Sequence, residues 1–228
     1  TGTVSFPGPL DYQRLLYSIP IQYKRLKKTS TTVHENGQSI NAYENLVYNG
    51  FNQIIKVVKG TSLDGKEMST TFKYPNEISD AIYQQMTAKN MLSPVIEQKS
   101  FRLVGGVESL LSTTQTGYKQ VGNIIVKDNI KSSTGILTPE IRVNFNQYDL
   151  KGNLLEQRKA NDISSAYYWG YNYQYPIAEA INAKGGEIYY APFEEQAGWS
   201  GTQWQFGDAA ISYDNSKTIT GRSAAKIE

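Results

Sequence analysis

The chain has 228 residues, of which 39% are hydrophobic and 19% charged, a length that allows one large β domain or one and a half domains with a sizeable core. Its formal net charge of +2 is too small to indicate a nucleic acid or an anionic membrane as partner, and no apolar run approaches the roughly 18 residues of a membrane span. The absence of cysteine excludes disulfides, thiolate metal sites and cysteine nucleophiles.

The first part of the chain predicts an irregular lead-in followed by a four-strand meander. Residues 1–20 contain Pro7-Gly8-Pro9, which prevents regular strand pairing. Because the chain starts at Thr1 without a methionine or a signal peptide, we expect it to be an internal part of a larger polypeptide. Asn36-Gly37 and Asp64-Gly65 favour tight hairpin turns, since these residues accept positive φ. The strands expected around them are residues 21–34, 39–48, 53–62 and 67–74.

A change of hydrophobic period then predicts a helix near residues 77–90. Apolar residues recur there at helical spacing, with Asn76 as the expected N-cap. Two further hairpins are expected after it, one around Gly105-Gly106 and one around residues 133–135. Their strands are predicted at residues 92–105, 107–118, 123–134 and 137–148.

The most informative stretch is the turn at residues 148–154, Tyr-Asp-Leu-Lys-Gly-Asn-Leu, with strand formers on both sides. The aspartate can bond its own backbone, and Gly152 and Asn153 tolerate positive φ. Residues 48–54 are a degenerate copy about 100 residues earlier, so we expect an internal strand-turn-strand repeat.

This turn resembles the signature of YD (RHS) repeats, and the aromatic run at residues 167–176 resembles the closing segment of YD-repeat proteins of the Bacteroidetes type. The resemblance implies a β-hairpin sheet on a large secreted or cell-surface protein. The residues that carry it are Tyr148, Asp149, Gly152, Asn153, Leu154, Trp169, Gly170, Tyr171 and Pro176.

The C-terminal part predicts a second short helix and then a change of domain. Pro176 at a first helical turn favours a helix at residues 176–183, and Gly185-Gly186 ends the first domain, expected at residues 21–184. Residues 187–228 resemble the first strands of jelly-roll carbohydrate-binding modules, so this stretch is expected to be the beginning of a truncated β-sandwich. The predicted fold class is mainly β, an antiparallel hairpin meander with two short helices.

Two sets of residues in this last stretch are candidate ligand sites. Trp199 and Trp204 offer flat apolar faces on which a sugar ring could stack, although core packing is the favoured interpretation for both. The resemblance to jelly-roll modules further implies structural calcium at Glu194 and Asp208, whose hard oxygen ligands suit that ion. No other cofactor is expected.

Catalytic chemistry is not predicted. His34 is the single histidine and would have to serve any Ser-His-Asp triad or zinc site; a surface position at a strand end is the favoured interpretation. Glu194 and Glu195 are adjacent and would point to opposite faces of a strand, and Glu140 and Glu156 fit solvated charges better than an acid pair.

The sequence therefore predicts a non-catalytic structural or interaction segment rather than an enzyme. The resemblance implies export to the cell surface or beyond, as cargo of a type 9 secretion system, with neighbouring repeats, the secretion machinery and glycans as partners. A carbohydrate-binding or adhesin module is the alternative, and the shell of a polymorphic toxin is a second one. The chain has no Asp-Pro dipeptide, which the self-cleavage segment of toxin-delivering RHS shells contains.

Overall fold

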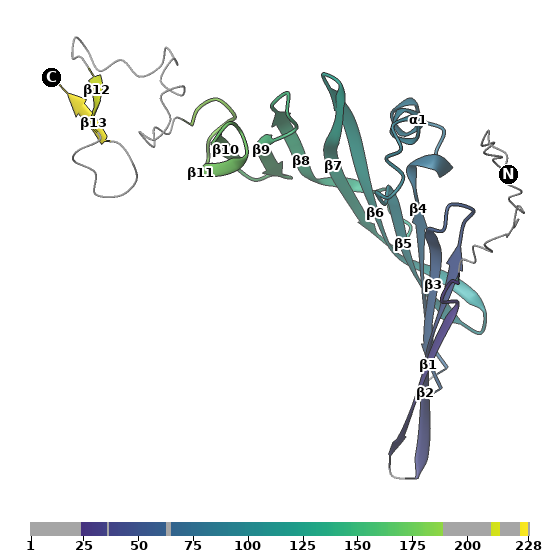
Figure 1. Cartoon of the computed structure of the whole chain (residues 1–228). Coiled ribbons are helices and arrows are strands. Elements are labelled where there is room, and N and C mark those ends of the chain that lie inside the picture. Colours follow the sequence, from purple (N-terminus) through teal and green to yellow (C-terminus); the bar gives the residue numbers. More distant parts are fainter. Residues whose placement is uncertain (1–23, 36, 63–64, 189–210, 215–223, 228) are drawn as a thin grey trace, which may run out of the picture.

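A computed structural model describes residues 24–35, 37–62, 65–188, 211–214 and 224–227. The expected fold class is confirmed: these residues are mainly β-strand, and eleven strands form one antiparallel meander in which each strand pairs with its neighbours in sequence. Figure 1 shows this sheet as a single, strongly twisted layer that runs from β1 to β11. Within the described residues no helix is long and apolar enough to cross a membrane.

The strands follow the expected order. The first group is β1 (Lys28–Glu35), β2 (Gln38–Tyr48), β3 (Ile54–Thr61) and β4 (Glu67–Lys73). The central group is β5 (Glu97–Val104), β6 (Val107–Val121) and β7 (Ile124–Thr134). The last group is β8 (Glu140–Tyr148), β9 (Leu154–Lys159), β10 (Ser164–Gly170) and β11 (Tyr175–Ile181).

Tight turns set the register of the hairpins. Glu35 faces Gln38 across the first turn, and Val104 faces Val107 across Gly105-Gly106. Both of these glycines have positive φ, 58° and 81°, as a type I′ turn requires. Register shifts interrupt several pairings, for example between Gly117 and Tyr118. Such bulges increase the local twist, in keeping with the curved sheet of Figure 1.

The helical insert between β4 and β5 differs in detail from the expectation. A 3-10 turn, η1 (Pro75–Glu77), comes first, Ile78 is extended, and α1 (Ala81–Ala88) begins four residues later than predicted, with Asp80 and not Asn76 at the N-cap. The reason is local, since Glu77 Oε2 accepts a hydrogen bond from the Tyr74 backbone N–H at 3.0 Å and closes the 3-10 turn.

The prediction of a second helix at residues 176–183 was wrong. Residues 175–181 form the edge strand β11, in which Ala178 pairs with Tyr168 and Pro176 with Trp169. Pairing along β10 overrides the local preference of the Ile-Ala-Glu-Ala run for a helix. Proline is tolerated because an edge strand pairs on one side alone.

The packed core is small and lies under the helical insert. Met86 is fully buried against Ile96 and Ile125, and five further apolar side chains pack around these three. Elsewhere large apolar side chains lie in solvent, on strands such as at Val107 (68% exposed) and in turns such as at Ile136 (93% exposed). Among the described residues the buried apolar side chains are few: Tyr74, Pro75, Met86, Ile96, Ile125 and Ala166.

The ends of the chain are described in part. The predicted lead-in at residues 1–20 lies outside the described residues. In the predicted second domain, β12 (Ile211–Asp214) pairs antiparallel with β13 (Ala224–Ile227). Trp199, Trp204, Glu194 and Asp208 lie outside the described residues.

Candidate functional site

The signature turn between β8 and β9 is held by the side chain of Asp149. Its Oδ1 accepts hydrogen bonds from the backbone N–H groups of Lys151 (2.8 Å) and Asn153 (2.9 Å), and its Oδ2 accepts one from Asn153 Nδ2 (2.9 Å). The backbone closes the same loop through Asp149 N–H to Asn153 O at 3.0 Å. Gly152 has a φ of +90°, and a Cβ there would approach Ile124 Cδ1 to 3.0 Å, so both conformation and space favour glycine.

The predicted copy at residues 48–54 has the same hydrogen bonds. Asn49 Oδ1 accepts from the backbone N–H groups of Phe51 and Gln53, each at 3.0 Å, and Asn49 N–H donates to Gln53 O at 2.9 Å. Asn52 takes the place of Gly152 with a φ of 63°. The expected internal repeat is thereby confirmed as two turns of one geometry.

Each turn is completed by an aromatic side chain at the end of the second strand after it: Trp169 lies on β10, and Tyr74 directly follows β4. The Tyr74 hydroxyl donates to Ile54 O at 2.9 Å, and Trp169 Nε1 donates to Leu154 O at 2.8 Å. Ile54 and Leu154 are the equivalent first residues of β3 and β9. The repeated unit is therefore three strands, β2–β3–β4 and β8–β9–β10, each with its aromatic clamp.

Sequence reasoning did not find this clamp. Tyr74 follows Ile54 by 20 residues and Trp169 follows Leu154 by 15, and one residue is a tyrosine and the other a tryptophan. The shared signal is an aromatic ring with a polar hydrogen at the end of the third strand, which becomes visible once the register is known.

The second turn also supports the connection between β10 and β11. Asn153 Nδ2 donates to Tyr173 O at 2.9 Å, and Lys151 Nζ donates to Asn172 O at 2.9 Å and lies 4.6 Å from the Tyr173 ring centroid. The backbone φ angle is positive at three successive residues, with values of 51°, 59° and 65° at Tyr171, Asn172 and Tyr173. Residues other than glycine rarely adopt this left-handed conformation. Lys151 and Asn153 of the second turn thus hold this strained connection in place.

We expect Asp149→Ala to lower the free energy of unfolding by about 2 kcal/mol, because two backbone N–H groups lose a charged acceptor. Asp149→Asn should cost about 1 kcal/mol, since its oxygen keeps the two backbone contacts that Asn49 makes in the first copy, but its Nδ2 cannot accept the hydrogen bond from Asn153 Nδ2. Urea midpoints followed by circular dichroism measure both. Equal losses for the two variants would contradict a role for the side-chain oxygen.

Tyr148, the first residue of the signature, lies in a half-buried aromatic and charged environment. Burial raises its pKa to about 12, and the negative charge of Asp128 and the neighbouring Tyr118 act in the same direction. Lys119 Nζ binds Asp128 at 3.1 Å and lies 5.7 Å from the Tyr148 ring centroid. The neutral phenol is therefore the form that the folded state favours.

This pKa predicts an alkaline transition. The folded pKa lies above the unfolded value of about 10, so the stabilisation is complete below pH 10 and is lost as the pH rises toward about 12. We expect the wild-type chain to lose stability relative to Tyr148→Phe across this window. The difference in tyrosinate absorbance between the two proteins measures the pKa; a Tyr148 transition near pH 10 would contradict the prediction.

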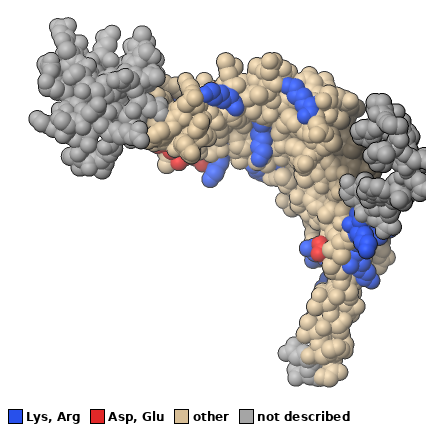
Figure 2. All heavy atoms as spheres, in the orientation of Figure 1, with Lys and Arg blue, Asp and Glu red and all other residues tan. Residues whose placement is uncertain are grey.

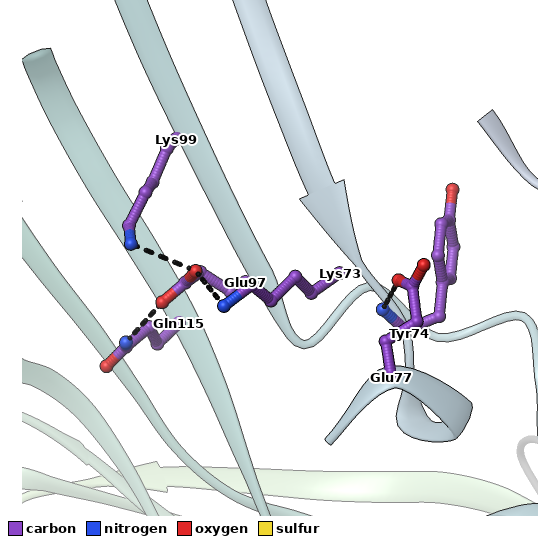
Figure 3. Close-up of polar contacts among 6 residues, drawn as sticks. All are labelled: Lys73, Tyr74, Glu77, Glu97, Lys99 and Gln115. Carbon is purple, nitrogen blue, oxygen red and sulfur yellow. Dashed lines mark hydrogen bonds and ion pairs between the residues drawn. The ribbon is translucent and has the colours of Figure 1, made fainter. Parts of the chain in front are cut away.

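A polar row crosses four strands beside the helical insert. Lys73, Glu97, Gln115 and Lys131 are consecutive cross-strand partners on β4, β5, β6 and β7. Glu97 accepts a hydrogen bond from Gln115 Nε2 at 2.8 Å and lies 3.1 Å from Lys99 Nζ and 3.4 Å from Lys73 Nζ (Figure 3).

Glu97 is the charged centre of this row, with 13% of its side chain exposed. Burial alone would raise the pKa of its carboxyl group, but the hydrogen bonds from Gln115 and Lys99 and the charges of Lys73 and Lys99 outweigh it, and the pKa lies below its usual range. Glu97 is therefore ionised at neutral pH and is already fully engaged by its partners.

The residues considered for catalysis have structural or solvated surroundings. His34 Nδ1 lies 2.7 Å from Ser39 Oγ on the exposed β1–β2 hairpin. The oxygens of Glu156 accept hydrogen bonds from Asn146, Ser164 and the backbone of Gly185. Glu140 is exposed and lies 3.7 Å from Arg142. In the described part of the chain no group of three or more His, Cys, Asp or Glu residues could hold a metal ion.

Charge adds little to these local features. On the face shown in Figure 2, lysine and arginine side chains are scattered over the sheet and uncharged residues cover most of the surface.

No protein-family model, curated protein or solved structure matches this chain.

Proposed function

We propose that the chain is a non-catalytic structural segment of a large exported YD-repeat protein, in which β-hairpins build a shell or scaffold at the cell surface. The observation that carries the proposal is the repeated three-strand unit, with its side-chain-closed turn and aromatic clamp. Two copies of one unit within a continuous meander are the pattern of a repeat architecture, in which neighbouring units bury each other's faces.

The thinness of the sheet supports the same proposal. A stable β domain buries its sheet against a second layer, and large apolar patches in solvent usually mark contact surfaces. Here a hollow of about 470 Å³ on β9–β11, lined by residues including Leu154, Trp169 and Ile177, is mainly apolar and lies beside the edge strand β11. Further repeats of the parent protein would cover such surfaces.

Export through a type 9 secretion system is the localisation that we propose with this architecture. The support is the resemblance of the signature residues to YD repeats of the Bacteroidetes type. The secretion machinery and neighbouring repeats are the partners that this proposal requires.

The test is to identify the parent polypeptide with an antibody against this chain. Its intact mass and flanking sequence should show many hundreds of residues with further Tyr-Asp-x-x-Gly-Asn turns, and protease added to intact cells should digest it. A polypeptide close to the size of this chain, or one that the protease reaches only after lysis, would refute the proposal.

A further inference from the structure

A hollow of about 310 Å³ lies between the helical insert and the strands β5, β6 and β7. Its size falls in the lower part of the range of small-molecule sites. One wall is formed by residues 78–83, which are anchored by the fully buried Met86, and the other by the polar row. The residues that matter for its chemistry are Lys73, Asp80, Tyr83, Gln115, Asn129 and Lys131.

The wall of this hollow is an insertion in the repeat. In the first unit, residues 74–96 separate β4 from β5, whereas in the second unit a short turn leads from β10 to β11. The repeated geometry does not need the insert, since the Trp169 clamp forms without one. Insertions of this kind in repeat proteins often form the binding face.

Three side chains around the hollow have unused hydrogen-bonding capacity. In the described part of the chain, the side chains of Lys131 and Asp80 make no hydrogen bond or ion pair, and Asp80 does not cap α1 through its side chain. Asn129 Oδ1 is buried without a partner beside Gly117, while its Nδ2 donates a hydrogen bond to Asp128 Oδ2 at 2.7 Å. Gly117 lets the Asn129 amide pack closely against its backbone, because a Cβ there would approach that amide to 2.9 Å.

The charges of the lining residues select the class of ligand. Lys73 and Lys131 are balanced by Asp80 and Glu97, so the lining has no net charge. A ligand with either sign of charge would meet one unpaired group of its own sign. Hydroxyl groups both donate and accept, so a neutral polyol can satisfy lysine, carboxylate and amide side chains together.

We propose that this hollow binds one or two sugar residues of a neutral saccharide. Lys131 donates to a ring or hydroxyl oxygen, Asp80 accepts from a hydroxyl group, and the ring of Tyr83 forms the apolar wall. The proposal does not depend on the proposed function, because it concerns the helical insert alone and holds for a repeat shell and a free-standing module alike.

The experiment is saturation-transfer NMR on the whole chain with glucose, galactose, mannose, N-acetylglucosamine and cellobiose, and with glucuronate and glucosamine as charged probes. We expect transfer from at least one neutral sugar. On the isotope-labelled wild-type protein, that sugar should shift the amide signals of Gly117, Asn129 and Lys131. Shifts confined to other parts of the chain, or binding of the charged probes alone, would refute the proposal.

Two conservative variants then test the named contacts. Lys131→Met and Asp80→Asn should each weaken binding by about tenfold, the effect of losing one hydrogen bond to a charged group. Asparagine caps a helix as well as aspartate does, so α1 should persist in Asp80→Asn. The matched control is Lys127→Met, an exposed position on the same strand, which should leave binding unchanged. Unchanged affinity in both variants would overturn the assignment, as would no transfer from any sugar.

Discussion

Met86→Ala is expected to lower the free energy of unfolding by about 2 to 5 kcal/mol, one of the largest single-residue effects in this chain. Met86 is fully buried and joins α1 to Ile96 and Ile125 in the one packed cluster of buried hydrophobic residues that the described part of the chain contains. An eight-residue helix is too short to be stable by itself, so α1 depends on this contact. The midpoint of urea unfolding, followed by circular dichroism, measures the effect.

Met68→Ala is the matched control. Met68 has the same side chain but lies on β4 with 44% of its surface exposed. Its loss should cost less than about 0.5 kcal/mol. If the two variants unfold at the same urea concentration, the cluster under α1 does not stabilise the fold in the way that the packing indicates.

Removal of either aromatic clamp is the second large effect that we expect. Tyr74→Ala and Trp169→Ala should each cost about 3 kcal/mol, because the ring packing is lost and the carbonyl of Ile54 or Leu154 loses its donor. The two losses should be similar, since the two clamps close equivalent units. Thermal and urea unfolding of each variant tests this.

The contribution of the hydrogen bond can be separated from that of the ring. Tyr74→Phe and Trp169→Phe keep an aromatic ring and remove the donor, so about 1 kcal/mol of the loss should remain. Phe51→Ala, an exposed aromatic in the first turn, is the control and should be nearly neutral. A loss for Phe51→Ala as large as for the clamps would show that aromatic content, and not the clamp geometry, stabilises the units.

The sequence by itself determined the order of the sheet and most of its turns. Strand formers alternating with Asn-Gly, Asp-Gly and Gly-Gly pairs predict hairpins, and hairpins place neighbours in sequence beside each other in space. That is why the strands from residue 38 to residue 159 lie close to their expected positions. The likeness of residues 48–54 to residues 148–154 was enough to predict the repeat, because the turn is closed by its own side chains.

The tertiary structure alone decided features that depend on register. Residues 175–181 have local preferences compatible with a helix, and pairing with β10 made them a strand. The clamps of Tyr74 and Trp169, and the row of Lys73, Glu97, Gln115 and Lys131, join residues whose alignment depends on every preceding turn and bulge. A shift of one residue moves a side chain to the opposite face of a sheet, so such contacts follow from the assembled register and not from local pattern.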